Sequence, residues 1–458
     1  MPSIVDKRRT AFVCQQCGHA APRWLGQCPA CQAWNALVEE VVAEPGRRGR
    51  APAAAGGPPR PLAEVAAAAA PRRSTGIAEL DRVLGGGLVA GSVVLLGGDP
   101  GIGKSTLALE ACAALGAGGP PVLYVAGEES PEQVALRAAR LGLGAAAVLV
   151  VAETAVEAIV EHVERVRPGA VVVDSIQTVH TPALGSAPGS VGQVRESAAL
   201  LAARAKASGV ACFLIGHVTK EGALAGPRVL EHLVDTVLYF EGDAGHPLRV
   251  LRAVKNRFGS TNEVGVFEMG ERGLAEVPNP SAAFLAERPV GAPGSAVLAT
   301  LEGSRPVLVE IQALVSRSAL AVPRRTAIGL DPGRVALLLA VLEKRAGLRL
   351  YDQDVFLNVA GGLRIDEPAA DLAVAAAVAS SARGRALEAD VALWGEVGLT
   401  GEVRSVGRAE ARLREAGRQG FARCVLPAAS ARGLPAVAGV TAVPVAALAG
   451  LFEALALA

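Results

Sequence analysis

The sequence predicts a modular α/β protein: a central region with a mostly parallel sheet, a small cysteine module before it and a second folded region after it. Short, β-branched apolar runs alternate with helical stretches in the central region, and these runs are nearly continuous in apolar residues. Strands covered by helices on both faces have this pattern. Two junctions rich in glycine and proline separate the regions. The expected strands begin at Ser92, Pro121, Ala147, Ala170, Val210 and Thr236.

The bulk composition is that of a globular protein. A chain of 458 residues is too long for one ordinary core and is expected to form about two to four domains. The longest apolar runs, such as the one from Val335, are shorter than a membrane span, and no signal-type segment follows the first residues. We therefore expect a cytoplasmic protein with no membrane partner. The net charge of +1 neither favours nor excludes nucleic acid.

Shifts in composition predict the domain limits. Residues 1–44 form the cysteine module, and residues 45–72 are a linker dominated by proline, glycine, alanine and arginine. Residues 73–276 hold the six apolar runs. A second junction opens the last domain, residues 277–458, whose strands and alanine-rich helices continue to the end of the sequence.

The cysteine module predicts a metal site. Four of the seven cysteines form two C-x-x-C pairs, Cys14 with Cys17 and Cys28 with Cys31. Two such knuckles bring four thiolates to one zinc ion at about 2.3 Å, and Zn²⁺ would supply the folding energy that so small a core cannot. Two disulfides or a redox pair are the alternatives, and the lack of a secretory signal disfavours disulfides. A closed four-thiolate site leaves no open position, which indicates an interaction module.

A phosphate-binding loop, GDPGIGKS, follows the first apolar run directly and precedes a helical stretch. Its glycines let backbone N–H groups surround a β-phosphate, Lys104 reaches the β- and γ-phosphates, and Ser105 ligates Mg²⁺. A chance match in a glycine-rich turn is the alternative, which the strand and helix on either side disfavour. The predicted ATP-binding residues are Gly98, Asp99, Pro100, Gly101, Ile102, Gly103, Lys104, Ser105, Thr106 and Asp174.

Acidic residues follow two of the predicted strands. Asp174 ends the run AVVVDS, where a Walker B carboxylate would hold Mg²⁺ through water, although many strands end in an aspartate that serves as a turn or cap residue. Glu128 and Glu129 follow the run at Pro121. At least one of them is expected to point at the γ-phosphate and position the attacking water, and the other to be a solvated or capping carboxylate.

Several motifs together carry a family resemblance: the phosphate loop, GEES (127–130), VVVDSIQT (171–178), GHVTKEG (216–222) and above all VKNRFGST (254–261). With the four-cysteine module, they resemble the RadA (Sms) family of bacterial DNA-repair proteins over essentially the whole chain. The resemblance implies a RecA-like ATPase core related to the RecA recombinase and the DnaB-type helicases. It also implies a homo-hexameric ring with ATP at the subunit interfaces.

The same resemblance implies roles for four residues. Glu128 matches the catalytic glutamate, His217 matches the sensor that links the γ-phosphate to the DNA-binding loop, and Lys255 and Arg257 would project into the neighbouring subunit's site. Such cations would make hydrolysis depend on assembly. Without the resemblance, Lys255 and Arg257 read as a solvated basic turn, and His217 as an ordinary histidine at a strand end.

Two loops, after AVVVDS and after VACFLIGH, match the channel-lining loops of RecA-like rings. They offer Gln193, Arg195, Lys220 and Arg228 as phosphate contacts. No aromatic residue interleaves them, so we expect salt-sensitive, sequence-independent binding to the backbone of single-stranded DNA. Plain mobile surface loops are the alternative.

The region from about residue 290 resembles the Lon protease domain, in DVFLNVAGGLRIDEPAADLAVAAAVASS and LWGEVGLTGEVRSVGRAEARLREAG. Lon-type hydrolysis requires a serine nucleophile activated by a lysine, whereas Ala369 and Glu410 occupy those positions. We therefore expect an α+β scaffold that is proteolytically inactive.

These observations predict a DNA-dependent ATPase that moves on single-stranded and branched DNA. It would promote branch migration of recombination intermediates in recombinational DNA repair, in a helicase-like manner and with the RecA recombinase as partner. ATP hydrolysis follows from the residues, and the DNA part follows mainly from the resemblance. A P-loop kinase and a Lon-type ATP-dependent protease are the alternatives. The first would need a phosphoacceptor pocket, and Ala369 and Glu410 oppose the second.

Overall fold

The computed structural model describes residues 9–14, 19–42, 72–144, 147–217, 230–242 and 246–457. The described chain separates into two compact units that divide between Glu276 and Val277, with Gly242–Leu248 assigned to the second. Most of the predicted linker, 45–71, lies outside the described residues. The domain limits at residues 44, 72 and 276 stay predictions.

The cysteine module is a small antiparallel sheet in the order β2-β1-β3. Among the described residues of the module, the core consists of four buried residues, Cys14, Ala21, Cys28 and Leu37, with a few partly buried neighbours. Two of these four are cysteines, so the thiols occupy much of the space that a larger domain fills with apolar side chains. The strands are β1 (Arg9–Cys14), β2 (Ala20–Ala21) and β3 (Leu37–Val42).

The central sheet has nine strands in the order β14-β13-β12-β11-β6-β10-β9-β7-β8. All six expected strands are present, and they form a continuous parallel set from β11 to β8. The antiparallel extension β12 to β14 was not predicted. The strands are β6 (Val93–Gly98), β7 (Val122–Ala126), β8 (Val148–Ala152), β9 (Ala170–Asp174), β10 (Ala211–Ile215), β11 (Thr236–Glu241), β12 (Leu248–Asn256), β13 (Val264–Gly270) and β14 (Gly273–Glu276).

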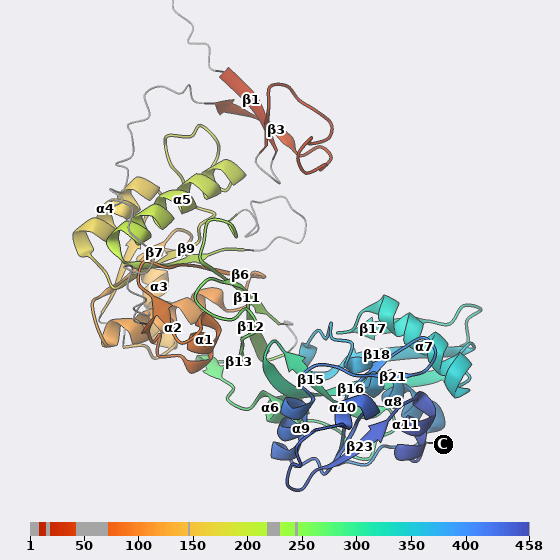
Figure 1. The fold of residues 1–458 in the computed structure, drawn as a ribbon. Coiled ribbons are helices and arrows are strands. Elements are labelled where there is room, and N and C mark those ends of the chain that lie inside the picture. Colours follow the sequence, from red (N-terminus) through yellow and green to blue (C-terminus); the bar gives the residue numbers. More distant parts are fainter. Residues whose placement is uncertain are drawn as a thin grey trace, which may run out of the picture. The chain divides into compact units, whose positions relative to one another are not determined.

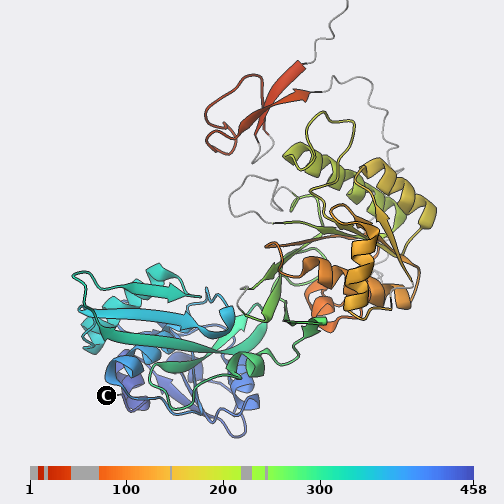
Figure 2. The same cartoon turned by 180° about the vertical axis from the view of Figure 1, so that it is seen from behind.

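Alternate side chains of the parallel strands enter two separate cores. In β6, Val94 and Leu96 pack with the residues of α1, α2 and α3, whereas Val93 and Leu95 pack with those of α4 and α5. Figures 1 and 2 show these two helical layers on opposite faces of the sheet. Burial on both faces is why the strands read as continuous apolar runs. The helices are α1 (Ala78–Leu84), α2 (Lys104–Ala117), α3 (Pro131–Arg140), α4 (Val156–Val166) and α5 (Val191–Ser208), and a short ribbon pairs β4 (Arg72–Arg73) with β5 (Leu88–Val89).

The second unit is built on a mixed sheet in the order β17-β18-β16-β15-β19-β22-β23. Its strands are β15 (Ser295–Glu302), β16 (Arg305–Arg317), β17 (Arg325–Ile328), β18 (Gln353–Val359), β19 (Val391–Leu393), β22 (Arg423–Pro427) and β23 (Thr441–Val445), with a separate ribbon of β20 (Glu396–Val397) and β21 (Val403–Arg404). Its helices are α6 (Pro280–Leu285), α7 (Pro332–Ala346), α8 (Ala370–Arg383), α9 (Ala409–Arg418), α10 (Ala428–Ala431) and α11 (Leu448–Ala454), and Ala360–Gly362 form a 3-10 turn.

Helix α8 is the buried centre of this unit. Every residue from Ala370 to Ser380 is buried, and the helix lies against β15 and β16. Six of those eleven residues are alanine, and such small side chains allow the helix to approach the sheet closely. Nowhere in the described part of the chain is a helix long and apolar enough to cross a bilayer.

Candidate active site

The phosphate loop connects β6 to α2, as the motif requires. Gly98 has φ 149° and Gly103 has φ 115°, a backbone region that L-residues rarely adopt. A Cβ atom at Gly98 would lie 2.5 Å from the carbonyl oxygen of Phe240. Both positions therefore favour glycine, because a side chain would strain the loop, and at Gly98 it would also collide with β11.

Lys104 is held inside the loop. Its ammonium donates hydrogen bonds to the carbonyl oxygens of Gly98 (2.9 Å) and Asp99 (2.8 Å), and only 3% of the residue is exposed. Burial lowers the pKa of Lys104 to about 8, while Asp174 and other nearby carboxylates oppose that shift. The side chain is therefore mostly cationic at pH 7 and faces a cluster of acids, an arrangement suited to a polyphosphate.

Three more predicted residues lie at the carboxyl ends of the next three strands on one side of β6 in the sheet. The order β6-β10-β9-β7 brings the phosphate loop, His217, Asp174 and Glu128 to the carboxyl ends of adjacent parallel strands. This edge is where open α/β sheets bind their ligands. Asp174 also accepts a hydrogen bond from the hydroxyl of Tyr124 (2.5 Å). Tyr124 lies inside the apolar run of β7 and was missed, because its position in that run resembles an ordinary core residue.

The two glutamates after β7 are directed differently. Ser175 donates a short hydrogen bond to Glu128 Oε1, and His217 Nε2 lies 3.5 Å from the same oxygen. The contact with His217, followed by that with Ser175, lowers the pKa of Glu128 to about 2 against the effect of burial, so this carboxylate is ionised at neutral pH. Glu129 instead forms an ion pair with Arg137 of α3. Glu128 is thus the acid that faces the neighbouring strand ends.

The KNRFG segment is anchored to residues of its own chain. Lys255 donates hydrogen bonds to the carbonyl oxygens of Glu231 (2.5 Å) and Val234 (2.9 Å). Arg257 forms an ion pair with the buried Asp235 at 3.2 Å. These three partners lie just before β11 and just after the undescribed segment 218–229.

Strand register places this segment away from the phosphate loop. Lys255 pairs with Val237, which pairs with Leu95, whereas the loop leaves the sheet three residues later, at Gly98. At about 3.3 Å per residue, the backbone of Lys255 is level with a point roughly 10 Å before the phosphate loop along β6. Because β12 runs in the opposite direction, the residues after Lys255 lie still closer to the amino end of β6. Lys255 and Arg257 therefore lie at the edge opposite to the phosphate loop.

The structure corrects one expected DNA contact. Gln193 is 1% exposed and lies in α5, where its amide binds the backbone of Thr181, Leu184 and Ser186. Its amide is buried and is already bonded to the loop before α5, so it cannot contact a phosphate. Arg195 is exposed on the same helix. Lys220 and Arg228 lie outside the described residues.

Three of the four predicted metal ligands come together. The sulfur atoms of Cys14, Cys28 and Cys31 lie within 4.8 Å of one another, and Cys14 Sγ is 3.6 Å from Cys31 Sγ. Thiolates at about 2.3 Å from a tetrahedral zinc ion are separated by roughly 3.8 Å. The described cysteines form no disulfide, and the donor set fits zinc. Cys17 lies outside the described residues.

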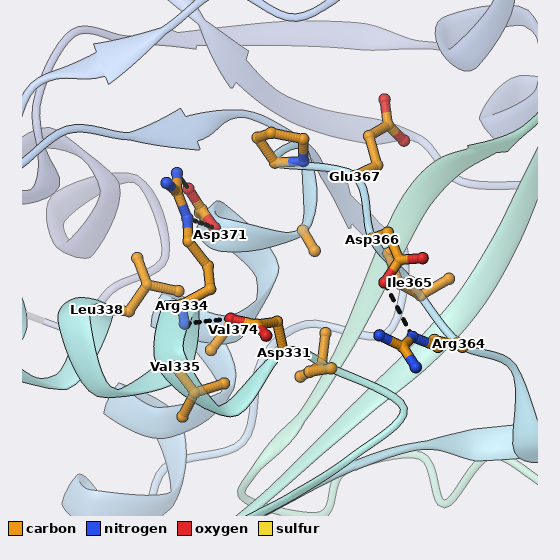
Figure 3. Close-up of a pocket in the computed structure, with 13 residues that line it drawn as sticks. Asp331, Arg334, Val335, Leu338, Arg364, Ile365, Asp366, Glu367, Asp371 and Val374 are labelled. Atoms are coloured by element: carbon orange, nitrogen blue, oxygen red, sulfur yellow. Dashed lines mark hydrogen bonds and ion pairs between the residues drawn. The ribbon is translucent and has the colours of Figure 1, made fainter. Parts of the chain in front are cut away.

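The second unit carries no peptidase machinery at the expected positions. Ala369 is buried just before α8, and the carboxylate of Glu410 pairs with Arg414. A pocket of about 380 Å³ lies alongside, where Arg334 binds Asp371 and Arg364 binds Asp366 (Figure 3). None of the described residues that line it is a serine, threonine, cysteine or lysine, so they offer no nucleophile of the Lon type.

Comparison with known proteins agrees with this layout. Residues 58–223 match the model of an AAA domain, residues 12–39 that of a rubredoxin metal-binding domain, and residues 344–442 that of the Lon protease (S16) C-terminal proteolytic domain. Together with the fold and the phosphate loop, these matches define a P-loop ATPase with an N-terminal metal-binding ribbon and a Lon-like C-terminal domain. This confirms the predicted fold class.

Full-length relatives identify the family. The chain is 57% identical to the DNA repair protein RadA of Pseudomonas aeruginosa over 93% of its own length and 94% of that protein. It is 52% identical to the DNA repair protein RadA of Bacillus subtilis, over 96% of its own length and 97% of that protein. The chain belongs to the RadA family, which confirms the resemblance seen in its motifs.

Proposed function

We propose that the chain is a DNA-dependent ATPase that translocates on single-stranded DNA and promotes branch migration of recombination intermediates. It would act as a homo-hexameric ring, with the RecA recombinase, in the DNA repair for which its relatives are named. The observation that carries the ATPase part is the edge of the central sheet. There the phosphate loop, His217, Asp174 and Glu128 follow neighbouring strands.

Each of these residues has a distinct task in hydrolysis. Lys104 exchanges its carbonyl partners for the β- and γ-phosphates of ATP and neutralises the charge that builds on them. Ser105 and Asp174 would hold Mg²⁺, which when bound offsets the remaining phosphate charge. Glu128 is ionised and orients the attacking water. Tyr124 acts through Asp174 and fixes the orientation of its carboxylate.

A neighbouring subunit completes the site. The roughly 10 Å offset in register supports this proposal, because neither Lys255 nor Arg257 can reach the nucleotide of its own subunit from the opposite edge. The half-exposed guanidinium of Arg257 and the exposed Val254 fit a surface that another subunit covers. Lys255 and Arg257 then act as fingers in trans.

The contact between Glu128 and His217 supports a link to DNA. His217 is the last described residue before the segment 218–229, which holds Lys220 and Arg228. On the other side of that segment, Lys255 binds the carbonyls of Glu231 and Val234. The segment expected to contact DNA therefore lies between His217 of the nucleotide site and the residues that hold Lys255.

A zinc ion would hold the N-terminal module together. Replacing Cys28 with alanine is expected to abolish zinc uptake, because three thiolates leave the tetrahedral site incomplete and the four-residue core cannot fold alone. Zinc content by atomic absorption and protection of residues 1–44 from protease measure this. Replacing the buried Cys112, which lies in the ATPase core, with alanine should leave the zinc content unchanged.

An ATPase assay with single-stranded DNA tests the proposed function. We expect phosphate release to rise as the DNA is added. The apparent DNA affinity should fall by orders of magnitude between about 50 and 200 mM salt if six or more phosphates are contacted. A rate of phosphate release that does not change when DNA is added would contradict the proposal. Transfer of phosphate to a small molecule would favour a kinase, and casein degradation that needs Lys104 would favour a protease.

A further inference from the structure

Two of the chain's three tryptophans lie on the surface of the cysteine module. Trp24 is 55% exposed and Trp34 is 72% exposed, whereas Trp394 in the second unit is completely buried. In the described part of the module, the fully buried side chains are small or medium in size, and Phe12 is partly buried against them. An indole buries more apolar area than any of these, so the stability of the module would favour both rings inside. Their exposure therefore points to contact with a partner.

The two rings border the same glycine. A Cβ atom at Gly26 would lie 3.7 Å from Cη2 of Trp24 and 3.9 Å from Cζ3 of Trp34. Glycine has no side chain, so residue 26 covers neither ring. The loop that carries them is also fixed, because Asn35 N donates to the carbonyl of Gly26 (2.7 Å) and Cys28 N donates to that of Ala33 (2.9 Å). The backbone that carries the rings is held before any partner binds, which lowers the entropic cost of binding.

The surroundings of the rings suit a polyanion. The stretch from His19 to Ala36 contains no aspartate or glutamate, and the exposed Arg23 directly precedes Trp24. After this stretch, the next acidic side chain is that of Glu39, on β3. When a base stacks on the indoles, the phosphates next to it would therefore lie near the cation of Arg23, and this stretch offers no carboxylate to repel them.

We propose that Trp24 and Trp34 form a stacking surface for the unpaired bases of single-stranded DNA, with Arg23 as a phosphate contact. Every base has a π-face, so stacking on indoles tolerates any sequence. This inference rests on the proposed function. The two tryptophans would supply the aromatic contacts that the expected channel-lining loops do not have. It also gives the zinc module a direct role in holding DNA.

Intrinsic fluorescence of the full-length, zinc-loaded protein reports on this surface, because the third tryptophan is buried. We expect an oligothymidylate to quench the fluorescence and an abasic oligomer of equal length to quench it much less. Binding is measured in parallel by the anisotropy of end-labelled DNA, which does not depend on tryptophan.

Substitutions separate stacking from charge. Trp24→Ala and Trp34→Ala should each weaken DNA binding by about tenfold, with the salt dependence unchanged because the phosphate contacts persist. Trp34→Phe should retain most of the affinity, since a phenyl ring also stacks. Val38→Ala is the matched control, because Val38 is another exposed apolar residue of the same module. Equal zinc content in all variants shows that the module is folded.

Four results would overturn the inference. If DNA binds by anisotropy but neither the fluorescence nor the Trp→Ala affinities change, the stacking surface is wrong while the proposed function stands. If the abasic oligomer quenches equally, the contact is with the backbone. If a protein partner quenches the fluorescence and DNA does not, the surface serves protein contact. If the wild-type protein binds no DNA at all, the proposed function fails, and the inference fails with it.

Discussion

Lys104→Ala is expected to remove ATP turnover, with a loss of at least about 100-fold in kcat. The ammonium is enclosed by the phosphate loop and is cationic at neutral pH, and it is the only lysine or arginine among the nine predicted loop residues. Without it, the charge that develops on the γ-phosphoryl oxygens loses its main protein counter-charge. Steady-state phosphate release at saturating DNA measures the effect.

The exposed Lys344 of α7 provides the control for Lys104. Lys344→Ala removes the same charge from the second unit and should leave turnover unchanged. A Lys104→Ala protein that remains folded by circular dichroism and hydrolyses ATP at the wild-type rate would show that the loop does not bind the reacting phosphates.

Lys255→Ala is expected to leave nucleotide binding largely intact and to reduce hydrolysis on the order of 10³-fold, as the loss of a finger in trans does. Binding is spared because Lys255 lies at the edge of the sheet opposite to its own phosphate loop. Fluorescent nucleotide titration and phosphate release separate the two effects. Lys206→Ala removes another lysine near Asp235 and should have little effect. Loss of nucleotide binding in Lys255→Ala would contradict the assignment.

Much of the ATPase fold follows from local sequence. Burial on both faces makes the parallel strands apolar throughout, and the phosphate loop marks the end of β6. The residues alone left open which of Glu128 and Glu129 faces the site, and the family resemblance favoured Glu128. The structure directs Glu128 toward Ser175 and His217 and pairs Glu129 with Arg137. Their catalytic roles stay proposals.

Other features are hidden by weaker local signals or depend on contacts between distant residues. The strands β12 to β14 pair with their neighbours in the chain, but they are only partly buried and so lack the continuous apolar runs that mark the parallel strands. Gln193 looked available for DNA because it follows a glycine-rich stretch, but α5 begins earlier and buries its amide. Tyr124 reads as core until Asp174 is found beside its hydroxyl. The exposure of Trp24 and Trp34 likewise required the folded module.

Mixed rings test the central claim, that ATP is hydrolysed between adjoining subunits. Lys255→Ala subunits retain Glu128, and Glu128→Gln subunits retain Lys255, so some interfaces of a mixed ring contain both intact residues. Phosphate release from equal mixtures should recover to roughly a quarter of the wild-type rate, since half of the sites and half of the neighbours are competent. No recovery above the two separate variants, in rings shown to exchange subunits, would contradict a site shared in trans.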